Sequence, residues 1–173
     1  MNNINIHSKP AAEYSDKFQD HAFEQYKIYL EMADRISSRR QSANTFFVSI
    51  NTILVTLAGY AKAATNADTF FYIVTSLAGV FICYIWYRLV LSYKNLNSAK
   101  FKVVHAIESE LPYKLFDAEW AAVGRGKDKT LYQPFTELEM RIPWIFASIH
   151  IIVLIYVIPW SKICSKLWLC AHP

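Results

Sequence analysis

The stretch "NTFFVSINTILVTLAG", Asn44 to Gly59, decides the fold of this chain. It is apolar and uncharged, yet small polar residues interrupt it at regular spacing. With the flanking positions they follow one another at steps of 4, 3, 4, 3, 4, 3 and 4: Ser38, Ser42, Thr45, Ser49, Thr52, Thr56, Gly59 and Ala63. Steps of three and four place these residues on one face of a helix. We call this set the small-residue seam.

The seam has two interpretations. Helices in a bilayer associate through close packing of small residues, so the seam is interpreted as an interface, either with another copy or with the next span, which offers Thr75, Gly79 and Cys83. In a ring of copies, the same hydroxyls, with Asn44 and Asn51, would instead line a water-filled path. On the opposite side of the helix we expect a stripe of bulky residues: Phe46, Ile50, Ile53, Leu57 and Tyr60.

Three uncharged runs have the length of membrane spans. The chain has 173 residues, of which 54% are hydrophobic, above the roughly 45–50% apolar usage of soluble domains. The excess lies in 41–61, 69–87 and 142–161, each near the roughly 17–25 residues that a helix needs to cross a bilayer. The first run lies too far from the start for a cleavable signal peptide. The alternative is a soluble protein with unusually buried helices.

Basic residues predict the orientation of the spans. Of the eighteen Lys and Arg residues, fifteen lie before the first run or between the second and the third. The other three are Lys62, between the first and second runs, and Lys162 and Lys166, after the third. The positive-inside rule therefore predicts a cytoplasmic amino terminus and a cytoplasmic segment 88–141, with the turn 62–68 and the tail 162–173 outside. Anionic lipid headgroups account for the net charge of +4 without a nucleic-acid partner.

The remaining segments have helical patterns. We expect a disordered tail over 1–12 and an amphipathic helix over 13–40, whose apolar stripe, from Ala22 to Ile36, stays in phase with the seam. The second span continues as a helix to Leu111-Pro112. A short helix over 116–123, a loop over 124–130 and a Thr136–Glu139 capping box complete the cytoplasmic part. The predicted fold is all-α: three transmembrane helices with long cytoplasmic extensions, assembled as a homo-oligomer.

A search for catalytic and metal-binding patterns predicts neither an enzyme nor a cofactor. "GRGKDKT", residues 124–130, resembles a phosphate loop, but Ala121 stands where the first glycine is needed. The five histidines have no paired spacing for a metal. Cys164 and Cys170, six residues apart, would point to different faces of a helix, so we expect no disulfide between them.

His150 is an ionisable residue near the middle of the third predicted span. Such residues are hypotheses for function, with a partner to be named. Asn51 lies at a similar depth of the first span, so we expect a hydrogen bond from His150 to Asn51 or Ser49. The contact is either a packing bond between helices or a gate that changes charge near neutral pH.

Three stretches carry a resemblance to a known family: "RRQSANTFF", "WYRLVLSYKNLNSAKFKVVHAIESELP" and "FDAEW". They resemble the RipA-like family of small octameric bacterial inner-membrane proteins. The matching positions are Arg39, Arg40, Asn44, Trp86, Tyr93, Leu96, Asn97, Lys100, Phe101, Glu108, Leu111, Pro112, Glu119 and Trp120. The resemblance implies an octamer in the bacterial inner membrane with no catalytic site. In that membrane, the orientation predicted from the basic residues gives a cytoplasmic amino terminus and a periplasmic carboxyl terminus. Similar small membrane proteins disrupt membranes as effectors of phage defence.

Two functions follow as hypotheses. In the first, a homo-oligomer forms or gates a pore as a stress or phage-defence effector, and its polar groups within the membrane are Asn44, Ser49, Asn51, Thr52, Thr56 and His150. In the second, a membrane scaffold docks a soluble protein on its cytoplasmic helices. The expected cytoplasmic interface residues are Arg39, Arg40, Tyr93, Asn97, Lys100, Glu108, Glu119 and Trp120.

Overall fold

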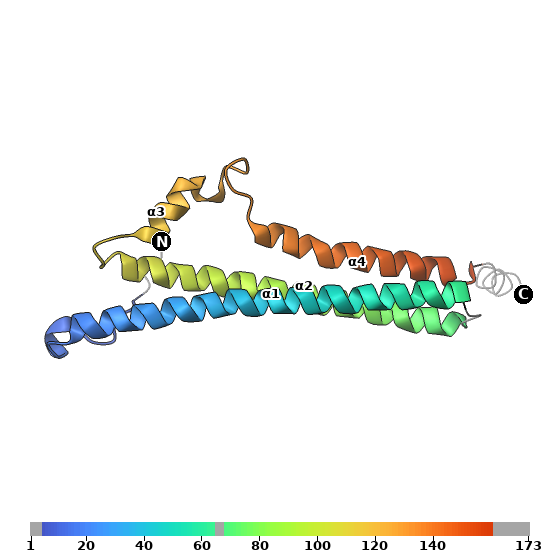
Figure 1. Cartoon of the computed structure of the whole chain (residues 1–173), viewed down its shortest axis with the longest axis horizontal. Coiled ribbons are helices and arrows are strands. Elements are labelled where there is room, and N and C mark those ends of the chain that lie inside the picture. Colours follow the sequence, from blue (N-terminus) through green and yellow to red (C-terminus); the bar gives the residue numbers. More distant parts are fainter. Residues whose placement is uncertain (1–4, 65–67, 161–173) are drawn as a thin grey trace, which may run out of the picture. The chain divides into compact units, whose positions relative to one another are not determined.

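The computed structural model describes residues 5–64 and 68–160, and every regular element in them is a helix. The long helices are α1 (Phe18–Ala64), α2 (Thr69–Glu108) and α4 (Phe135–Val157), labelled in Figure 1. Between the last two lies α3 (Leu115–Ala122), and 3-10 turns lie at Ala11–Glu13 (η1) and Gly124–Gly126 (η2).

The predicted all-α fold with three candidate spans is confirmed, because α1, α2 and α4 are each long and apolar enough to cross a membrane. Several predicted segments fall wholly or partly outside the described residues: the tail 162–173 with Cys164 and Cys170, the centre of the turn 62–68, and the first four residues of the tail 1–12. The described part of the tail 1–12 includes His7, whose Nε2 lies 2.6 Å from Glu110 Oε1.

The chain divides into two compact units. The first comprises Met1–Asn44 and Leu89–Met140, and the second comprises Thr45–Arg88 and Arg141–Pro173. The second unit takes up most of the three predicted spans, and the first unit takes up most of the charged segments. We describe each unit separately.

The face that α1 buries differs from the predicted one. Its buried and half-buried positions form one heptad series, which includes Ala22, Tyr26, Tyr29, Ala33, Ile36, Arg40, Phe47, Asn51, Leu54, Ala58 and Ala61. Every member of the small-residue seam is exposed. The prediction that the stripe ending at Ile36 runs in phase with the seam is therefore wrong. The two residues from Ile36 to Ser38 turn the helix by about 200°, which reverses the face.

The bulky stripe also takes a different place. Asn51 lies on the buried face of α1, and Ile53 follows it by two residues, whereas Thr56 follows it by five. At about 100° per residue, Ile53 and Thr56 both point away from Asn51 and lie only about 60° apart, so the bulky stripe lies beside the seam instead of opposite it. The seam is therefore not the interface of α1 with α2 that the sequence suggested as one alternative.

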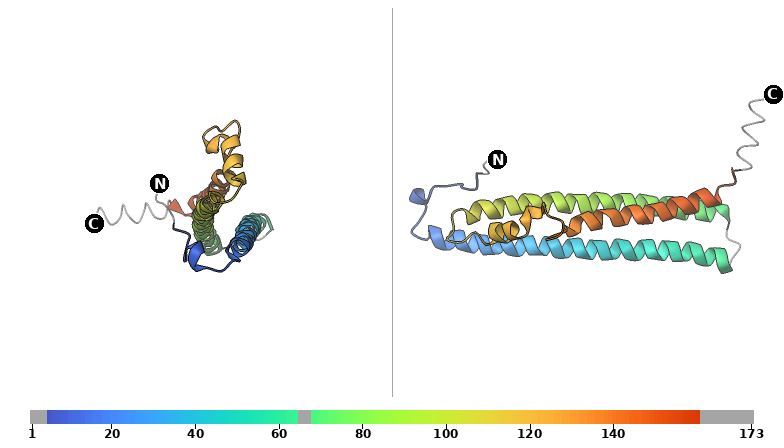
Figure 2. Two further views of the ribbon diagram at one scale, coloured as in Figure 1. Left: turned by 90° about the vertical axis from the view of Figure 1, so that its left-hand side faces the viewer. Right: turned by 90° about the horizontal axis from the view of Figure 1, so that it is seen from above.

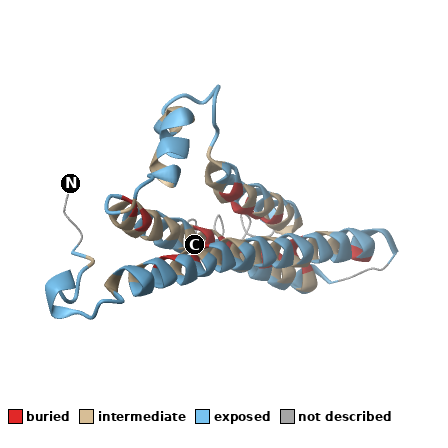
Figure 3. Cartoon of the chain, turned by 60° about the vertical axis from the view of Figure 1, so that its left-hand side comes forward, coloured by how far each residue is buried: buried red, intermediate tan, exposed pale blue. Residues whose placement is uncertain are grey.

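In the second unit α2 supplies the centre of the core. Its buried residues within this unit follow at steps of 4, 3, 4 and 3: Tyr72, Ser76, Gly79, Cys83 and Trp86. The Trp86 ring stacks on Phe47 of α1 at 5.7 Å and lies 6.1 Å from the ring of Phe146 of α4. Figure 2 shows the three helices of this unit side by side, and in Figure 3 the buried residues form short red patches on them.

The start of α4 corrects a further prediction. The helix begins at Phe135, so Thr136 lies inside it and not at the capping position. Thr136 and Glu139 contact Arg40 of α1 instead of each other's backbone. The capping-box interpretation is therefore wrong. Pro143, expected near the end of the third span, lies inside α4 and is fully buried.

Candidate functional site

A buried polar cluster joins the three helices of the second unit. Asn51 of α1, Cys83 of α2 and His150 of α4 are 0%, 2% and 3% exposed. Asn51 Nδ2 donates to the Phe47 carbonyl oxygen at 2.8 Å, which leaves Asn51 Oδ1 as the acceptor. Cys83 Sγ donates to this oxygen at 3.1 Å, and His150 Nε2 lies 3.2 Å from it. This last contact is a hydrogen bond in the tautomer that carries its proton on His150 Nε2.

The position of His150 depends on Gly79. A Cβ atom built on Gly79 would overlap the His150 ring, so only a residue without a side chain fits here. Of the two partners that the sequence suggested for His150, the structure supplies Asn51. Cys83 and Gly79 were expected only as small packing residues, and their contacts with Asn51 and His150 were missed. A sequence motif could not reveal these contacts, because Cys83 and Asn51, like Gly79 and His150, lie far apart in the chain.

The hydroxyl groups of the seam lie apart from this cluster. Ser49, Thr52 and Thr56 are exposed on α1. Ser49 Oγ donates to the Thr45 carbonyl at 2.9 Å, and Thr52 Oγ1 donates to the Val48 carbonyl at 2.8 Å. Of the predicted pore residues, Asn51 and His150 thus form a buried pair and Asn44 is half-buried. The other three form an exposed hydroxyl row: Ser49, Thr52 and Thr56.

A buried ion pair lies in the first unit, at the amino-terminal end of α4. Arg40 Nε and Glu139 Oε2 are 3.5 Å apart, with side chains 18% and 5% exposed. Arg40 Nη1 donates to Thr136 Oγ1 at 3.4 Å, and Asn44 Nδ2 donates to Glu139 Oε1 at 2.8 Å. Arg40 and Asn44 were both predicted as site residues, but their carboxylate partner was missed, because Glu139 fitted a capping pattern. These contacts join α1 to α4.

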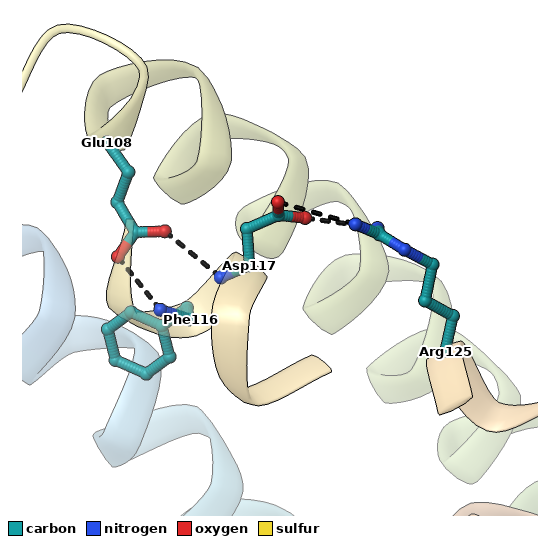
Figure 4. A network of polar contacts seen from close by, with 4 residues as sticks. All are labelled: Glu108, Phe116, Asp117 and Arg125. Carbon is teal, nitrogen blue, oxygen red and sulfur yellow. Dashed lines mark hydrogen bonds and ion pairs between the residues drawn. The ribbon is translucent and has the colours of Figure 1, made fainter. Parts of the chain in front are cut away.

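Glu108, the last residue of α2, binds the start of α3. Its Oε1 accepts the Phe116 N–H at 3.0 Å and its Oε2 accepts the Asp117 N–H at 3.3 Å, as Figure 4 shows. A carboxylate at a helix amino terminus satisfies free N–H groups and opposes the positive end of the helix dipole. Glu108 is 1% exposed. The sequence singled it out, but not as the cap of another helix.

Two neighbouring groups have shifted pKa values. Tyr26 donates its hydroxyl to Glu108 Oε1 at 3.4 Å. Burial, followed by the charge and hydrogen bond of Glu108, raises the pKa of Tyr26. Arg125 binds Asp117 at 3.0 Å, and this hydrogen bond lowers the pKa of the Asp117 carboxyl.

The other predicted cytoplasmic residues do not form one site. Lys100 Nζ lies 4.5 Å from the centre of the Tyr29 ring. Trp120 is 37% exposed, and its ring centre lies 6.0 Å from that of Tyr132. Tyr93 and Asn97 are half-buried, and Arg39 and Glu119 are exposed.

These contacts are of a kind that positions helices. Among the described residues there is no group of three or more His, Cys, Asp or Glu side chains that could bind a metal ion. The polar groups of each cluster bind one another and the backbone across two or three helices. The exposed hydroxyl row is the part of the predicted site that another molecule or water can reach.

Comparison with known proteins identifies the family. A family model described as the octameric membrane protein family (8xMP) matches residues 23–159, which is most of the chain. The comparisons with curated proteins and with solved structures gave no match. The family's name implies a homo-octamer in a membrane, in agreement with the three candidate spans. The chain belongs to the octameric membrane protein family.

Proposed function

We propose that eight copies of this chain surround a permeation path that the assembly forms or gates, and that the row of seam hydroxyls on α1 lines this path. The protein acts without catalysis. One observation carries the proposal: Ser49, Thr52 and Thr56 are exposed on the face of α1 that lies opposite its contacts with α2 and α4. Ser49, Thr56 and Thr52 lie about 160°, 140° and 100° around the helix from the buried Asn51, and Thr52 lies about 160° from the half-buried Leu54.

The symmetry of a membrane octamer favours a ring. All copies enter the bilayer in the same direction, so the axis that relates them runs along the membrane normal, and equivalent copies form a closed ring around it. With neighbouring axes about 8–10 Å apart, eight central α1 helices leave an opening of about 5–8 Å radius. Such an opening is too wide for serine and threonine side chains to fill.

The hydroxyl groups suit a path for water and cations. Ser49 and Thr52 donate their protons to backbone carbonyls one turn earlier, so their oxygen lone pairs face outward. Oxygen acceptors along a pore stabilise cations in place of their hydration shell. We therefore expect leakage to favour cations over anions.

Substitution of the hydroxyl row tests the proposal. The double variant Ser49→Leu, Thr52→Leu should abolish most of the ion leakage that the active protein causes in liposomes or cells, because the apolar side chains dewet the path. Dye release and membrane potential are the measurements. The control is Ser148→Leu: Ser148 is an exposed residue of α4 with the same type of bond, donating to the Trp144 carbonyl at 2.8 Å. Intact leakage with a disrupted octamer would show that the seam packs against another copy.

The cellular setting is part of the same proposal. The chain would lie in the bacterial inner membrane with its amino terminus in the cytoplasm and its carboxyl terminus in the periplasm, as the positive-inside rule predicts. The first unit would then receive a cytoplasmic signal, and the protein would act as a stress or phage-defence effector. The narrower RipA-like relationship also remains a prediction.

A second candidate is a scaffold that docks a soluble protein on the first unit. Large apolar side chains are exposed around α3: Tyr113 is 74% exposed, Leu115 is 67% exposed and Leu131 is 62% exposed. Trp120→Ala should then abolish the capture of a stoichiometric partner, while Phe23→Ala, at a residue of α1 that is 50% exposed, should not. Equal capture by both variants would argue against docking at α3.

A further inference from the structure

An apolar groove lies between α2 and α4 in the second unit. Its lining comes from one row on each helix: Val80, Cys83, Tyr84 and Tyr87 on α2, and Pro143, Trp144, Ala147 and Ile151 on α4. The cavity volume is about 170 Å³. An apolar cavity of about 150 Å³ accommodates a benzene ring, so this groove accommodates a short stretch of one hydrocarbon chain.

Aromatic residues and arginines frame one end of the groove. The rings of Tyr87 and Trp144 are 5.4 Å apart. Arg88 Nη1 donates to the Tyr84 hydroxyl at 3.2 Å, which places this guanidinium beside a lining residue. Arg141 precedes the lining residue Pro143 by two positions on α4. This end of the groove is therefore basic, whereas the lining is apolar.

The two arginines are available to an anion. Arg88 and Arg141 are exposed, and in residues 5–64 and 68–160 neither forms an ion pair with a carboxylate. Glu139, which precedes Arg141 by two positions in the sequence, is buried and binds Arg40 and Asn44. In the octamer, a neighbouring copy would place its own Arg88 and Arg141 at the same depth in the membrane, because rotation about the membrane normal does not change depth. A neighbouring copy would therefore add basic residues at this depth.

We propose that this groove binds one acyl chain of an anionic phospholipid, and that Arg88 and Arg141 bind its phosphate. The apolar lining matches the chain, the exposed guanidinium groups match the headgroup, and Trp144 and the tyrosines lie where aromatic residues meet the membrane interface. Guanidinium groups bind phosphate oxygens through paired N–H donors. The site is independent of the proposed pore, because it is built from α2 and α4 and not from the seam.

Native mass spectrometry of the purified octamer tests the headgroup part. Nanodiscs containing phosphatidylglycerol and phosphatidylcholine should yield about one retained phosphatidylglycerol per chain. We expect Arg88→Gln and Arg141→Gln each to reduce the preference for phosphatidylglycerol about fivefold, the contribution of one basic residue near an anionic headgroup. The control is Lys62→Gln, which changes a basic residue in the last turn of α1 that does not line the groove. It should leave the preference for phosphatidylglycerol unchanged. Equal preference in the wild type and the double arginine variant would overturn the proposal.

Filling the groove tests the acyl-chain part. Ala147→Phe places a ring in the cavity and should abolish lipid retention, whereas Ala78→Phe, at an exposed position of α2, should retain the lipid. Both variants are first checked for an intact octamer. If Ala147→Phe dissociates the octamer without changing the bound lipid, a second copy occupies the groove and the lipid proposal is wrong. The arginine variants, whose side chains are exposed, keep the test valid if Ala147→Phe fails to fold.

Discussion

Replacement of Glu139 by alanine should lower the free energy of unfolding by about 3 kcal/mol, because removal of one partner leaves a buried charge uncompensated. Arg40 would keep a guanidinium that is only 18% exposed, now without its carboxylate. Asn44 would lose the acceptor of its 2.8 Å hydrogen bond. The measurement is reversible denaturation in mixed detergent and SDS micelles, followed by circular dichroism.

An exposed ion pair in the same unit provides the matched control. Glu31 binds Arg35 at 2.6 Å, with side chains 63% and 67% exposed, so Glu31→Ala should cost about 0–1 kcal/mol. The double variant Arg40→Met, Glu139→Leu should cost less than Glu139→Ala alone, because apolar replacement of both partners leaves no buried charge. If Glu139→Ala and Glu31→Ala lower the free energy of unfolding by the same amount, the buried pair does not stabilise the packing of α1 against α4.

The second large effect is expected at Gly79. Gly79→Val should destabilise the second unit by about 1–3 kcal/mol, the cost of overpacking a close-packed core. The added side chain would overlap the His150 ring, and His150 could keep its hydrogen bond to Asn51 only if α2 moved away. Denaturation in mixed micelles measures the loss, and the His150 ring signals in NMR spectra report the displaced ring.

Gly59→Ala is the control for Gly79→Val. A Cβ atom on Gly59 meets nothing within 4 Å in the described part of the chain. Alanine should therefore stabilise α1 by up to about 1 kcal/mol through its higher helix propensity. Equal effects of the two variants would contradict the close approach of Gly79 to His150. Loss of the octamer in Gly59→Ala would place a neighbouring copy, and not water, against the seam.

The three long helices could be predicted from the sequence because each contains a long run without charged residues. A span needs only an apolar run between charged residues, so three helices followed directly from composition. The contact of His150 with Asn51 could also be anticipated, because two polar groups at similar depth in a membrane have few other partners. The predicted roles of both residues remain untested.

The buried face of α1 could not be predicted, because it has no uniform chemistry. It combines Phe47, Asn51, Leu54 and Ala58, which differ in size and polarity. The seam shows the same heptad spacing with residues of one kind, so it gave the clearer pattern on the wrong face. Glu139 was missed for a related reason: the capping pattern is local, whereas its actual partner lies far away in the sequence.

The contact of Glu108 with α3 has a consequence for the connection between α2 and α3. Both ends of the segment Ser109–Lys114 are fixed by one carboxylate, which belongs to the end of α2 and binds the first amides of α3. The register of α3 is therefore set by a side chain and not by the length of the connection. Each doubling of a flexible loop costs only about 0.6 kcal/mol, so this segment can change in length and sequence while the helix after it keeps its start.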